Sequence, residues 1–426
     1  MKHIVIIGGG TGGTLAANRL RRHFAEEEVV IDVVDGNDDH LYQPGLLFIP
    51  FGILNHEDIV RSRTAQLHEG IRMHIDTVDH IDPHSHRVVL GGGSSLPYDA
   101  CVIASGSVLL PQATEGLLGP GWMESVFTFY DPVGATALAR SLGAFQHGRI
   151  VIDIADMPIK CPVAPLEFTF LADWYFHEKG VRDDVSITFA TPLSGAFTKP
   201  VCSTSLGHLL EEKHVELVPD FLCSSVDEDR HIIASYDGRE LPYDLAVVVP
   251  IHEGAPFVGR TEGLGDALNF VKVDPATLQS TSYPDIFAIG DAADIPASKA
   301  GSVAHFEGEV LVRNVDAVLR GVAPSAAFDG HVNCFVETGF GKALLIDYNY
   351  DQEPVPGHFP SALGLPLMKE SRMNHVAKLL FQWFYWHGLL PGREIPGIPD
   401  AMPLSGKQLV GAVQERVPAG TRRKEH

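Results

Sequence analysis

Apolar residues open the chain as a short continuous run, and glycines interrupt that run before a helix-like stretch begins. Residues 4–7 are Ile or Val, residues 8–13 are glycine at all but one position, and residues 14–24 combine apolar and basic side chains. A second apolar run, residues 29–34, ends in Asp35. Short β-branched runs bounded by glycine favour buried strands. The pattern predicts a strand, a glycine loop, a helix and a second parallel strand.

Similar apolar runs recur along the chain, and helix-like stretches separate several of them. The runs that predict further buried strands cover residues 98–107, 148–154, 185–190 and 283–289. Strands that alternate with helices are typical of doubly wound α/β domains. Between residues 56 and 97, short runs at 71–75 and 88–90 with glycine turns indicate a small antiparallel excursion from the main sheet.

These elements group into two α/β domains of the Rossmann type. We expect the first dinucleotide-binding domain to be discontinuous, with residues 1–112 and 244–322, and the second, degenerate one to span residues 113–243. Residues 323–426 form a third, C-terminal module. The length of 426 residues is compatible with two or three domains at ~150 residues each.

The C-terminal module combines an expected hairpin near Cys334 with an aromatic segment. Residues 376–390 read VAKLLFQWFYWHGLL, and Arg372, Lys378 and Arg393 accompany them. Aromatic and basic side chains at this density suit an amphipathic helix that lies in a membrane interface. A plain buried C-terminal helix is the alternative.

Charge and hydrophobicity narrow the possible partners. The chain has 32 basic and 54 acidic residues, a formal charge of −22, which argues against nucleic acid as a partner. No run approaches the ~18 apolar residues of a membrane-spanning helix, and no signal-peptide pattern precedes the first strand. We therefore expect a peripheral membrane protein at the cytoplasmic face, with a homo-oligomer left open.

The glycine cluster has the spacing of a dinucleotide-binding loop. Gly8, Gly10 and Gly13 fit G-x-G-x-x-G, in which glycine permits the tight turn, the approach of a pyrophosphate and close helix packing. The phosphates then lie at a helix N-terminus, and Asp35 is placed to accept a hydrogen bond from a ribose hydroxyl. A glycine-rich turn without a ligand is the alternative.

The second unit lacks such a loop. After the strand at residues 148–154, residues 155–167 contain no glycine, and Asp156 adds negative charge where a phosphate would lie. This domain has the strands and helices of an NAD-binding domain but lacks the glycine loop that would bind the pyrophosphate. We therefore expect one bound dinucleotide in the protein.

The five cysteines form no metal or disulfide motif, since they are widely spaced without any C-x-x-C. We expect Cys101 and Cys223 in the core, and Cys202 in a loop at residues 198–205 with a structural role. Cys161 stands at the expected start of a helix, where the helix terminus would favour a thiolate of low pKa.

Taken together, the chain resembles the sulfide:quinone oxidoreductase and flavocytochrome c sulfide dehydrogenase group of flavoproteins. The resemblance is carried by the glycine loop, Asp35, residues 98–106, Cys161-Pro162, Gly290-Asp291, Cys334 and the aromatic tail. It implies FAD as the cofactor, with Asp291 beside its ribityl and phosphate groups. It also implies that Cys161 and Cys334 form a redox pair beside the flavin.

In the mechanism that this resemblance implies, hydrosulfide attacks a disulfide or sulfur bridge between Cys161 and Cys334. Sulfur leaves as persulfide or polysulfide, and two electrons pass through the flavin to a quinone. The chain departs from many members of the group because residues 102–160 contain no third cysteine. This leaves the product's chain length, a covalent flavin link and the role of Cys202 open.

The candidate site residues fall into three groups. Glu167, beside Cys161, is expected to move protons in catalysis, with a salt-bridged surface glutamate as the alternative. Lys299, unless it is a surface lysine, would stabilise the reduced flavin. The expected cofactor residues are Gly8, Gly10, Thr11, Gly12, Gly13, Asp35, Pro44, Ser105, Gly106, Gly290, Asp291, Lys299 and Gly301, and the expected quinone residues are Phe340, Phe381, Phe384 and Tyr385.

Two other functions remain open. The first is an NADH:quinone oxidoreductase of type II, against which the loop at residues 155–165 argues. The second is a flavoprotein subunit that passes electrons from sulfur compounds to a protein such as a cytochrome. The aromatic tail favours quinone over a protein acceptor.

Overall fold

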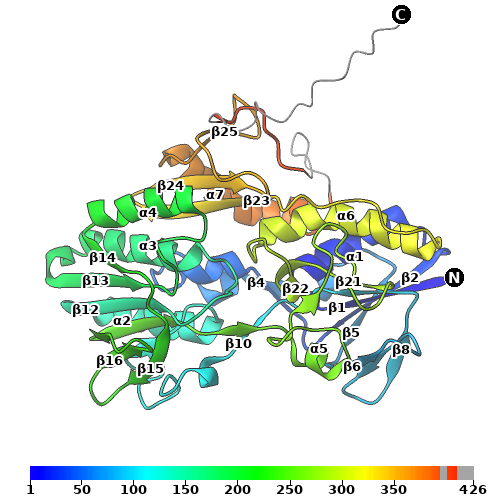
Figure 1. Cartoon of the computed structure of the whole chain (residues 1–426), viewed down its shortest axis with the longest axis horizontal. Coiled ribbons are helices and arrows are strands. Elements are labelled where there is room, and N and C mark those ends of the chain that lie inside the picture. Colours follow the sequence, from blue (N-terminus) through cyan, green and yellow to red (C-terminus); the bar gives the residue numbers. More distant parts are fainter. Residues whose placement is uncertain (394–400, 410–426) are drawn as a thin grey trace, which may run out of the picture.

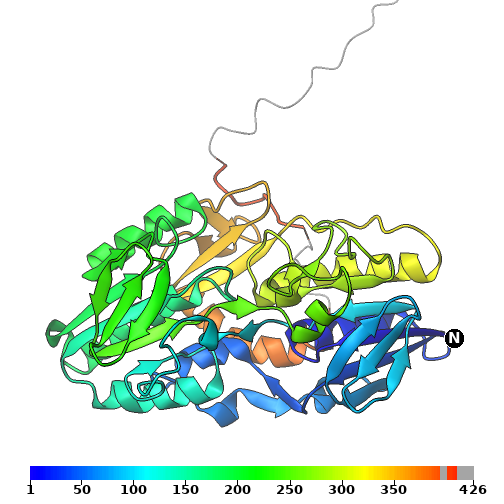
Figure 2. The ribbon, with the colours of Figure 1, turned by 60° about the horizontal axis from the view of Figure 1, so that its bottom comes forward.

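The computed structural model describes residues 1–393 and 401–409 of the chain. Residues 394–400 and 410–426 of the expected C-terminal module lie outside the described residues. Figures 1 and 2 show two α/β lobes side by side, with the C-terminal segments, in orange, packed near their junction. The expected α/β class with two Rossmann-like sheets is confirmed.

A five-stranded parallel sheet with the order β21-β9-β1-β2-β5 forms the first lobe. Ile4, Val5 and Ile6 in the middle of β1 are fully buried, as is usual for parallel strands covered on both faces. Helices α1 and α6 pack against each other beside this sheet. The elements are β1 (Lys2–Ile7), α1 (Thr11–His23), β2 (Val29–Asp35), β5 (Ile71–Ile75), β9 (Ala100–Ile103), β21 (Ile286–Ala288) and α6 (Gly301–Leu319).

One part of the expected excursion belongs to the main sheet. Residues 71–75, expected in an antiparallel excursion, form β5 and pair in parallel with β2. A strand that returns to a sheet edge after a long connection can pair with its neighbour in either orientation. The short apolar run at residues 71–75 predicts a strand but does not indicate whether that strand is parallel or antiparallel. The antiparallel excursion itself is β6 (Val78–Asp82), β7 (Arg87–Leu90) and β8 (Ser95–Pro97).

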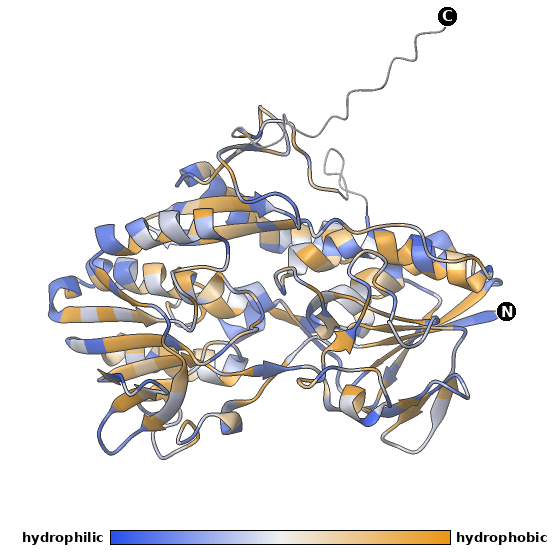
Figure 3. Ribbon diagram, in the orientation of Figure 1, coloured by the Kyte–Doolittle hydropathy of each residue, from blue (hydrophilic) through white to orange (hydrophobic). Residues whose placement is uncertain are grey.

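The second lobe repeats the plan with a parallel sheet of order β11-β18-β12-β13-β14. Figure 3 shows its strands largely in the apolar colour. Cys202 lies inside a helix of this lobe, α4, and not in the expected loop, because that helix already begins at Pro200. The elements are β11 (Val126–Phe127), α2 (Pro132–Ala144), β12 (Gly148–Ile154), α3 (Ala164–Glu178), β13 (Val185–Ala190), α4 (Pro200–Glu212), β14 (Val215–Val218) and β18 (Leu245–Val249).

Short elements complete both lobes and connect them. They are the antiparallel sheet β15 (Cys223–Asp227), β16 (Ile232–Ser235) and β17 (Glu240–Pro242), the ribbons β3 (Asp39–Leu41) with β4 (Val60–Ser62), β10 (Val108–Leu109) with β19 (His252–Glu253) and β20 (Val271–Lys272) with β22 (Ala293–Asp294), and helix α5 (Pro256–Arg260).

The C-terminal segments contain two hairpins and a helix. The expected hairpin is β23 (Val332–Gly339) with β24 (Lys342–Tyr348), and it packs on α3 and α6. A smaller ribbon, β25 (Gly357–Phe359) with β26 (Leu365–Leu367), precedes α7 (Arg372–Phe384). Helix α7 starts four residues before the expected segment, because the Ser371 side chain accepts a hydrogen bond from the Asn374 N–H at its N-terminus.

One side of α7 packs on the hairpin, and the other is apolar and exposed. Its exposed residues are Met373, Val376, Leu379, Leu380 and Trp383. A single wide turn, residues 385–389, continues the helix and is buried at Tyr385 and Trp386. Within the described residues, no helix combines the length and the apolar character needed to cross a bilayer.

Candidate active site

A pocket at the junction of the lobes begins at the glycine loop. Gly8 has φ +98°, and a Cβ there would lie 2.4 Å from the carbonyl oxygen of Ala104. A Cβ at Gly13 would lie 1.7 Å from the Gly8 oxygen, so Gly13 packs behind the loop and does not line the pocket. Gly10 precedes α1 and provides no side-chain cap, which leaves the first N–H groups of that helix open to an anion.

Asp35 lines the pocket at the end of β2. Its Oδ2 accepts a hydrogen bond from the Gly9 N–H at 2.8 Å, and its carboxylate pairs with Arg63. Arg63 also donates to the carbonyl oxygen of Asp39 at 2.7 Å and itself lines the pocket. The sequence pattern did not identify Arg63, because nothing in a local pattern relates it to a residue two strands earlier.

The Gly290-Asp291 turn closes the opposite side of the pocket. Gly290 has φ +64°, and its N–H donates to Oε2 of Glu307 at 2.6 Å. Burial raises the pKa of Glu307 to about 7 and also raises the pKa of Asp291. Helix α6 begins beyond this turn at Gly301, again without a side-chain cap. Two uncapped helix N-termini, of α1 and α6, thus adjoin one pocket.

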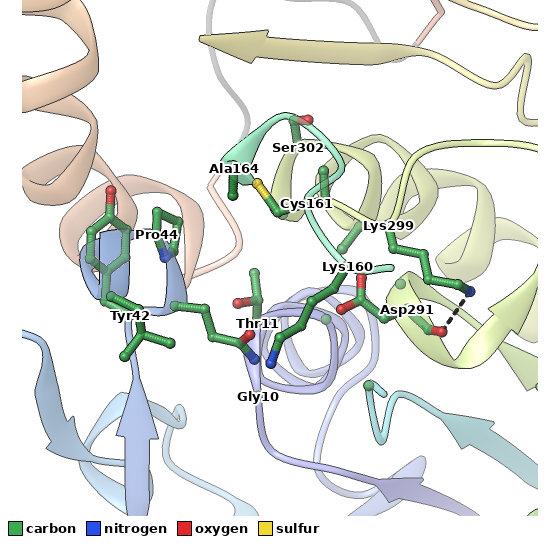
Figure 4. A pocket seen from close by; sticks show the side chains of 18 of the residues that line it. Gly10, Thr11, Tyr42, Pro44, Lys160, Cys161, Ala164, Asp291, Lys299 and Ser302 are labelled. Carbon is green, nitrogen blue, oxygen red and sulfur yellow. Dashed lines mark hydrogen bonds between the residues drawn. The ribbon is translucent and has the colours of Figure 1, made fainter. Parts of the chain in front are cut away.

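Lys299, the lysine expected beside the flavin, bonds to the turn itself, and a lysine that the sequence did not single out, Lys160, faces the glycine loop (Figure 4). Lys299 lines the pocket, but its ammonium donates to the carbonyl oxygens of Asp291 and Ala293 at 2.8 and 2.9 Å. Figure 4 shows it turned away from the glycine loop, whereas Lys160 extends toward Gly10. Burial lowers the pKa of Lys160, and the charge of Asp291 opposes this.

Cys161 and Cys334 both line this pocket as free thiols. Cys161 has φ +47° and lies three residues before α3, with its N–H bonded to the Lys299 oxygen at 2.6 Å. Cys334 reaches the pocket from β23. The electrostatic interaction between the two thiols contributes to the raised pKa of Cys161.

The expected low pKa of Cys161 is wrong. Burial raises the pKa of this thiol well above its usual value, and the nearby Glu167 raises it further. Burial likewise raises the pKa of Cys334 to about 12. The helix terminus does not prevail because desolvation of a thiolate outweighs a helix-end charge. The positive charge of Lys378 lowers the pKa of both thiols.

Glu167 is a buried pocket residue, which excludes the surface-glutamate alternative. It lies in the first turn of α3, its carboxylate pairs with Lys378 of α7, and its Oε1 accepts the Glu337 N–H at 2.6 Å. Burial raises the pKa of Glu167, while Lys378 and the Glu337 N–H lower it. Lys378 also lines the pocket. The aromatic tail thus supplies a cation to the site as well as rings.

The expected quinone residues do not all lie together. Phe381 and Tyr385 line the pocket. Phe384 does not line it, but the centroid of its ring lies 6.2 Å from the centroid of the Phe381 ring. Phe340 lies apart, 43% exposed in the turn of the β23–β24 hairpin. Its ring faces the Lys213 ammonium at 4.7 Å.

Tyr385 connects the tail to the glycine loop. Its hydroxyl lies 2.7 Å from the Thr11 hydroxyl and 2.7 Å from Nε2 of His40. Burial lowers the pKa of His40 to about 4, so this ring is neutral near pH 7. The sequence did not single out His40.

The remaining cofactor candidates fit the expected ligand. Gly12, Pro44, Ser105, Gly106, Gly290 and Gly301 all line the pocket. A glycine loop that a Cβ would obstruct, two open helix N-termini, an acid after β2 and an apolar wall suit an adenine dinucleotide with a ring system at its far end. The pocket therefore fits FAD.

Comparisons with known proteins agree with this geometry. Residues 2–141 match the family of pyridine nucleotide-disulphide oxidoreductases. The chain is 25% identical over 396 residues to the mitochondrial sulfide:quinone oxidoreductase of Mus musculus, covering 91% of this chain and 86% of that protein. It is 31% identical over 323 residues to the type II NADH:quinone oxidoreductase NdhA of Mycobacterium tuberculosis, covering 69% and 66%.

A solved structure supports the fold over nearly the whole chain. The sulfide:quinone oxidoreductase of Aquifex aeolicus superposes with a TM-score of 0.78 at 20% identity, covering 92% of each chain. The expected resemblance to the sulfide:quinone oxidoreductase group is confirmed.

Proposed function

We propose that this protein is an FAD-dependent sulfide:quinone oxidoreductase. The observation that carries the proposal is that Cys161, just before α3, and Cys334, in the tail hairpin, both line the pocket of the glycine loop. The likeness of nine-tenths of the chain to a sulfide:quinone oxidoreductase supports the same donor and acceptor. No cysteine lies in residues 41–54, where disulfide reductases of this fold class carry their pair.

The cofactor would be held by the glycine loop, Asp35, and the Gly290-Asp291 turn. FAD, when bound, supplies the two-electron store that links the donor to the acceptor. Lys160 places a positive charge on the glycine-loop side of the pocket, where phosphates carry negative charge. The apolar wall excludes water from the reacting end.

The sulfur chemistry belongs to the cysteine pair. With Cys161 and Cys334 joined as a disulfide or sulfur bridge, HS⁻ breaks one S–S bond, leaving a persulfide on one cysteine and a thiolate on the other. Lys378 stabilises that thiolate, since its charge lowers the pKa of both cysteines. Re-forming the bridge releases two electrons and one proton for each hydrosulfide whose sulfur is retained.

The acceptor side lies toward the tail. Phe381 and Tyr385 line the pocket, and Phe384 supports Phe381, so this wall suits the apolar ring of a quinone. The exposed apolar side of α7 would dock on a membrane surface, where quinones dissolve. Phe340 does not line the pocket and does not belong to the exposed apolar side of α7.

An anaerobic titration tests the proposal. Sulfide should bleach the flavin absorbance of the purified holoenzyme, and a soluble quinone should restore it. NADH should leave the absorbance unchanged, because the second lobe has no glycine loop at residues 155–165. Bleaching by NADH with no response to sulfide would make the protein a type II NADH dehydrogenase and overturn the assignment.

A further inference from the structure

A group of acid–base side chains extends from the pocket to the outside of α7. Glu167 and Lys378 line the pocket, with side chains that are 4% and 10% exposed. Glu337 on β23 is 2% exposed, and its carboxylate holds Nδ1 of His375 at 2.9 and 3.0 Å. The His375 side chain is 25% exposed and therefore reaches water.

We propose that Glu337 and His375 carry protons between solvent and the Glu167–Lys378 pair when the acceptor is reduced. The inference rests on the proposed function for the identity of the acceptor. Oε1 of Glu167 accepts a hydrogen bond from the backbone N–H of Glu337 at 2.6 Å, which holds the two residues side by side, and their carboxylates interact electrostatically. Lys378 and His375 lie three residues apart on α7 and so project from neighbouring positions on that helix.

The stoichiometry of the reaction requires such a route. Oxidation of HS⁻ to enzyme-bound sulfur yields two electrons and one proton, and reduction of a quinone to a quinol consumes two electrons and two protons. One proton per turnover must therefore enter from solvent: HS⁻ + quinone + H⁺ gives bound sulfur + quinol. Phe381 and Tyr385, from the same segment as Lys378, also line the pocket.

The position of His375 on α7 suits proton entry. The exposed apolar residues of α7 include Val376, next to His375 in sequence, and Leu379, four residues after His375. A helix docked by that side would hold His375 at the edge of the membrane, where interfacial water remains available.

A purely structural reading of these residues is that they fix α7 to the hairpin. Buried ion pairs of this kind are often no more stabilising than apolar residues of similar volume. The two readings differ in kinetics, because only a proton route responds to small proton carriers in solution.

The experiment follows the acceptor half-reaction alone. The holoenzyme is reduced by light without sulfide, mixed with a soluble quinone in dilute buffer, and its flavin reoxidation is followed by stopped flow. His375→Gln should slow reoxidation by about tenfold, and Glu337→Gln similarly. Added imidazole should restore the rate of His375→Gln. The matched control is His387→Gln. This exposed histidine of the same segment contacts the Trp383 oxygen and stacks on the Trp383 ring, and it does not line the pocket.

The outcomes separate this inference from the proposed function. Wild-type rates in His375→Gln, or slow rates that imidazole leaves unchanged, would overturn the proton route, whatever sulfide does. If sulfide fails to bleach the wild-type flavin while imidazole rescue is seen, the donor assignment falls and the route stands. If quinone fails to reoxidise the wild-type enzyme, both the acceptor assignment and the route are wrong.

Discussion

At the scale of the residue, burial determines the charge state of the groups around the pocket. Desolvation raises the pKa of Cys161, Cys334 and Glu167, and the ammonium of Lys378 opposes it for all three. One cation thus favours the ionised form of three groups, although burial favours their neutral forms. Removing that cation should cost more than removing any one of its partners.

This dependence predicts the outcome of a double-mutant cycle. Lys378→Met should lower the free energy of unfolding at pH 7.5 by about 3 kcal/mol, because it leaves the Glu167 carboxylate buried without its partner. Adding Glu167→Gln should recover much of that loss, as measured by urea unfolding. Lys342→Met, which breaks an exposed pair with Glu370, is the control and should change little. Additive effects of the two pocket substitutions would contradict the coupling.

A second residue-scale prediction concerns Asp153, which is fully buried in β12. No N–H or O–H group in the described residues donates to its carboxylate, and only the Cys223 thiol is close. Burial raises the pKa of Asp153 to about 7. The folded protein therefore keeps a proton that the unfolded chain loses near pH 4. Stability should fall as the pH rises from about 4 to 7, by about 4 kcal/mol from this group.

The measurement compares urea unfolding midpoints at pH 5 and pH 8. Asp153→Asn cannot ionise, so its midpoint should fall less over this range than the wild-type midpoint. Asp229→Asn, at an exposed turn, should keep the wild-type dependence. An unchanged pH dependence in Asp153→Asn would show that Asp153 ionises at its ordinary pKa.

At the scale of the element, α7 works on two sides. Its packed side supplies Lys378 and Phe381 to the pocket. Its other side consists of exposed apolar residues, of which Trp383 has the largest exposed fraction, 64%. Clustered exposed side chains of this size on a single helix indicate a contact surface. Under the proposed function, the same helix would contact a membrane on one side and form part of the acceptor wall on the other.

The two sides of α7 should be separable by substitution. Leu380→Ser with Trp383→Ser should abolish co-sedimentation with phospholipid vesicles while sulfide still bleaches the flavin, because neither residue lines the pocket. Val133→Ser is the control, since Val133 is 71% exposed on α2. Vesicle binding that survives the double substitution would assign the membrane contact to another surface.

At the scale of the whole molecule, the pocket is assembled from segments that span most of the chain. The glycine loop, the approach to α3, the Gly290-Asp291 turn, the hairpin and α7 each contribute to it. Cys161 precedes α3 and Cys334 lies in β23, so neither residue belongs to the glycine loop. Substituting both cysteines should therefore leave the glycine loop intact.

Cysteine substitutions test this separation. Cys161→Ser or Cys334→Ser should bind as much flavin as the wild type, measured as the ratio of flavin absorbance to protein absorbance. The rate of sulfide-dependent quinone reduction should fall by at least ~100-fold, because the nucleophilic pair is broken. Cys223→Ala, in the core of the second lobe, should retain activity. Turnover that persists in either serine variant would disprove the redox pair.

Local patterns in the sequence were sufficient for most of the elements and for the strand, glycine turn and helix at the start of the chain, but not for the pairing of residues 71–75 or for the start of α4. Residues 4–7, the glycines and Asp35 can be recognised from the sequence alone, because strand, turn and helix preferences depend on a few neighbouring residues. Arg63, Lys160 and His40 could not, because their roles depend on contacts between distant segments. The pKa of Cys161 also differed from its expectation, since burial is a property of the folded molecule and the helix terminus is a local one.

The hydrogen bonds of Tyr385 to Thr11 and His40 bear on how the protein matures. The last wall of the pocket and the bond that holds the glycine loop come from a residue near the end of the chain. A nascent chain whose first lobe has emerged from the ribosome still lacks Lys378 and Tyr385. The dinucleotide site is then open on one side, so we expect stable capture of the cofactor only after α7 and Tyr385 have been synthesised, and chains truncated before α7 should be isolated as apoprotein.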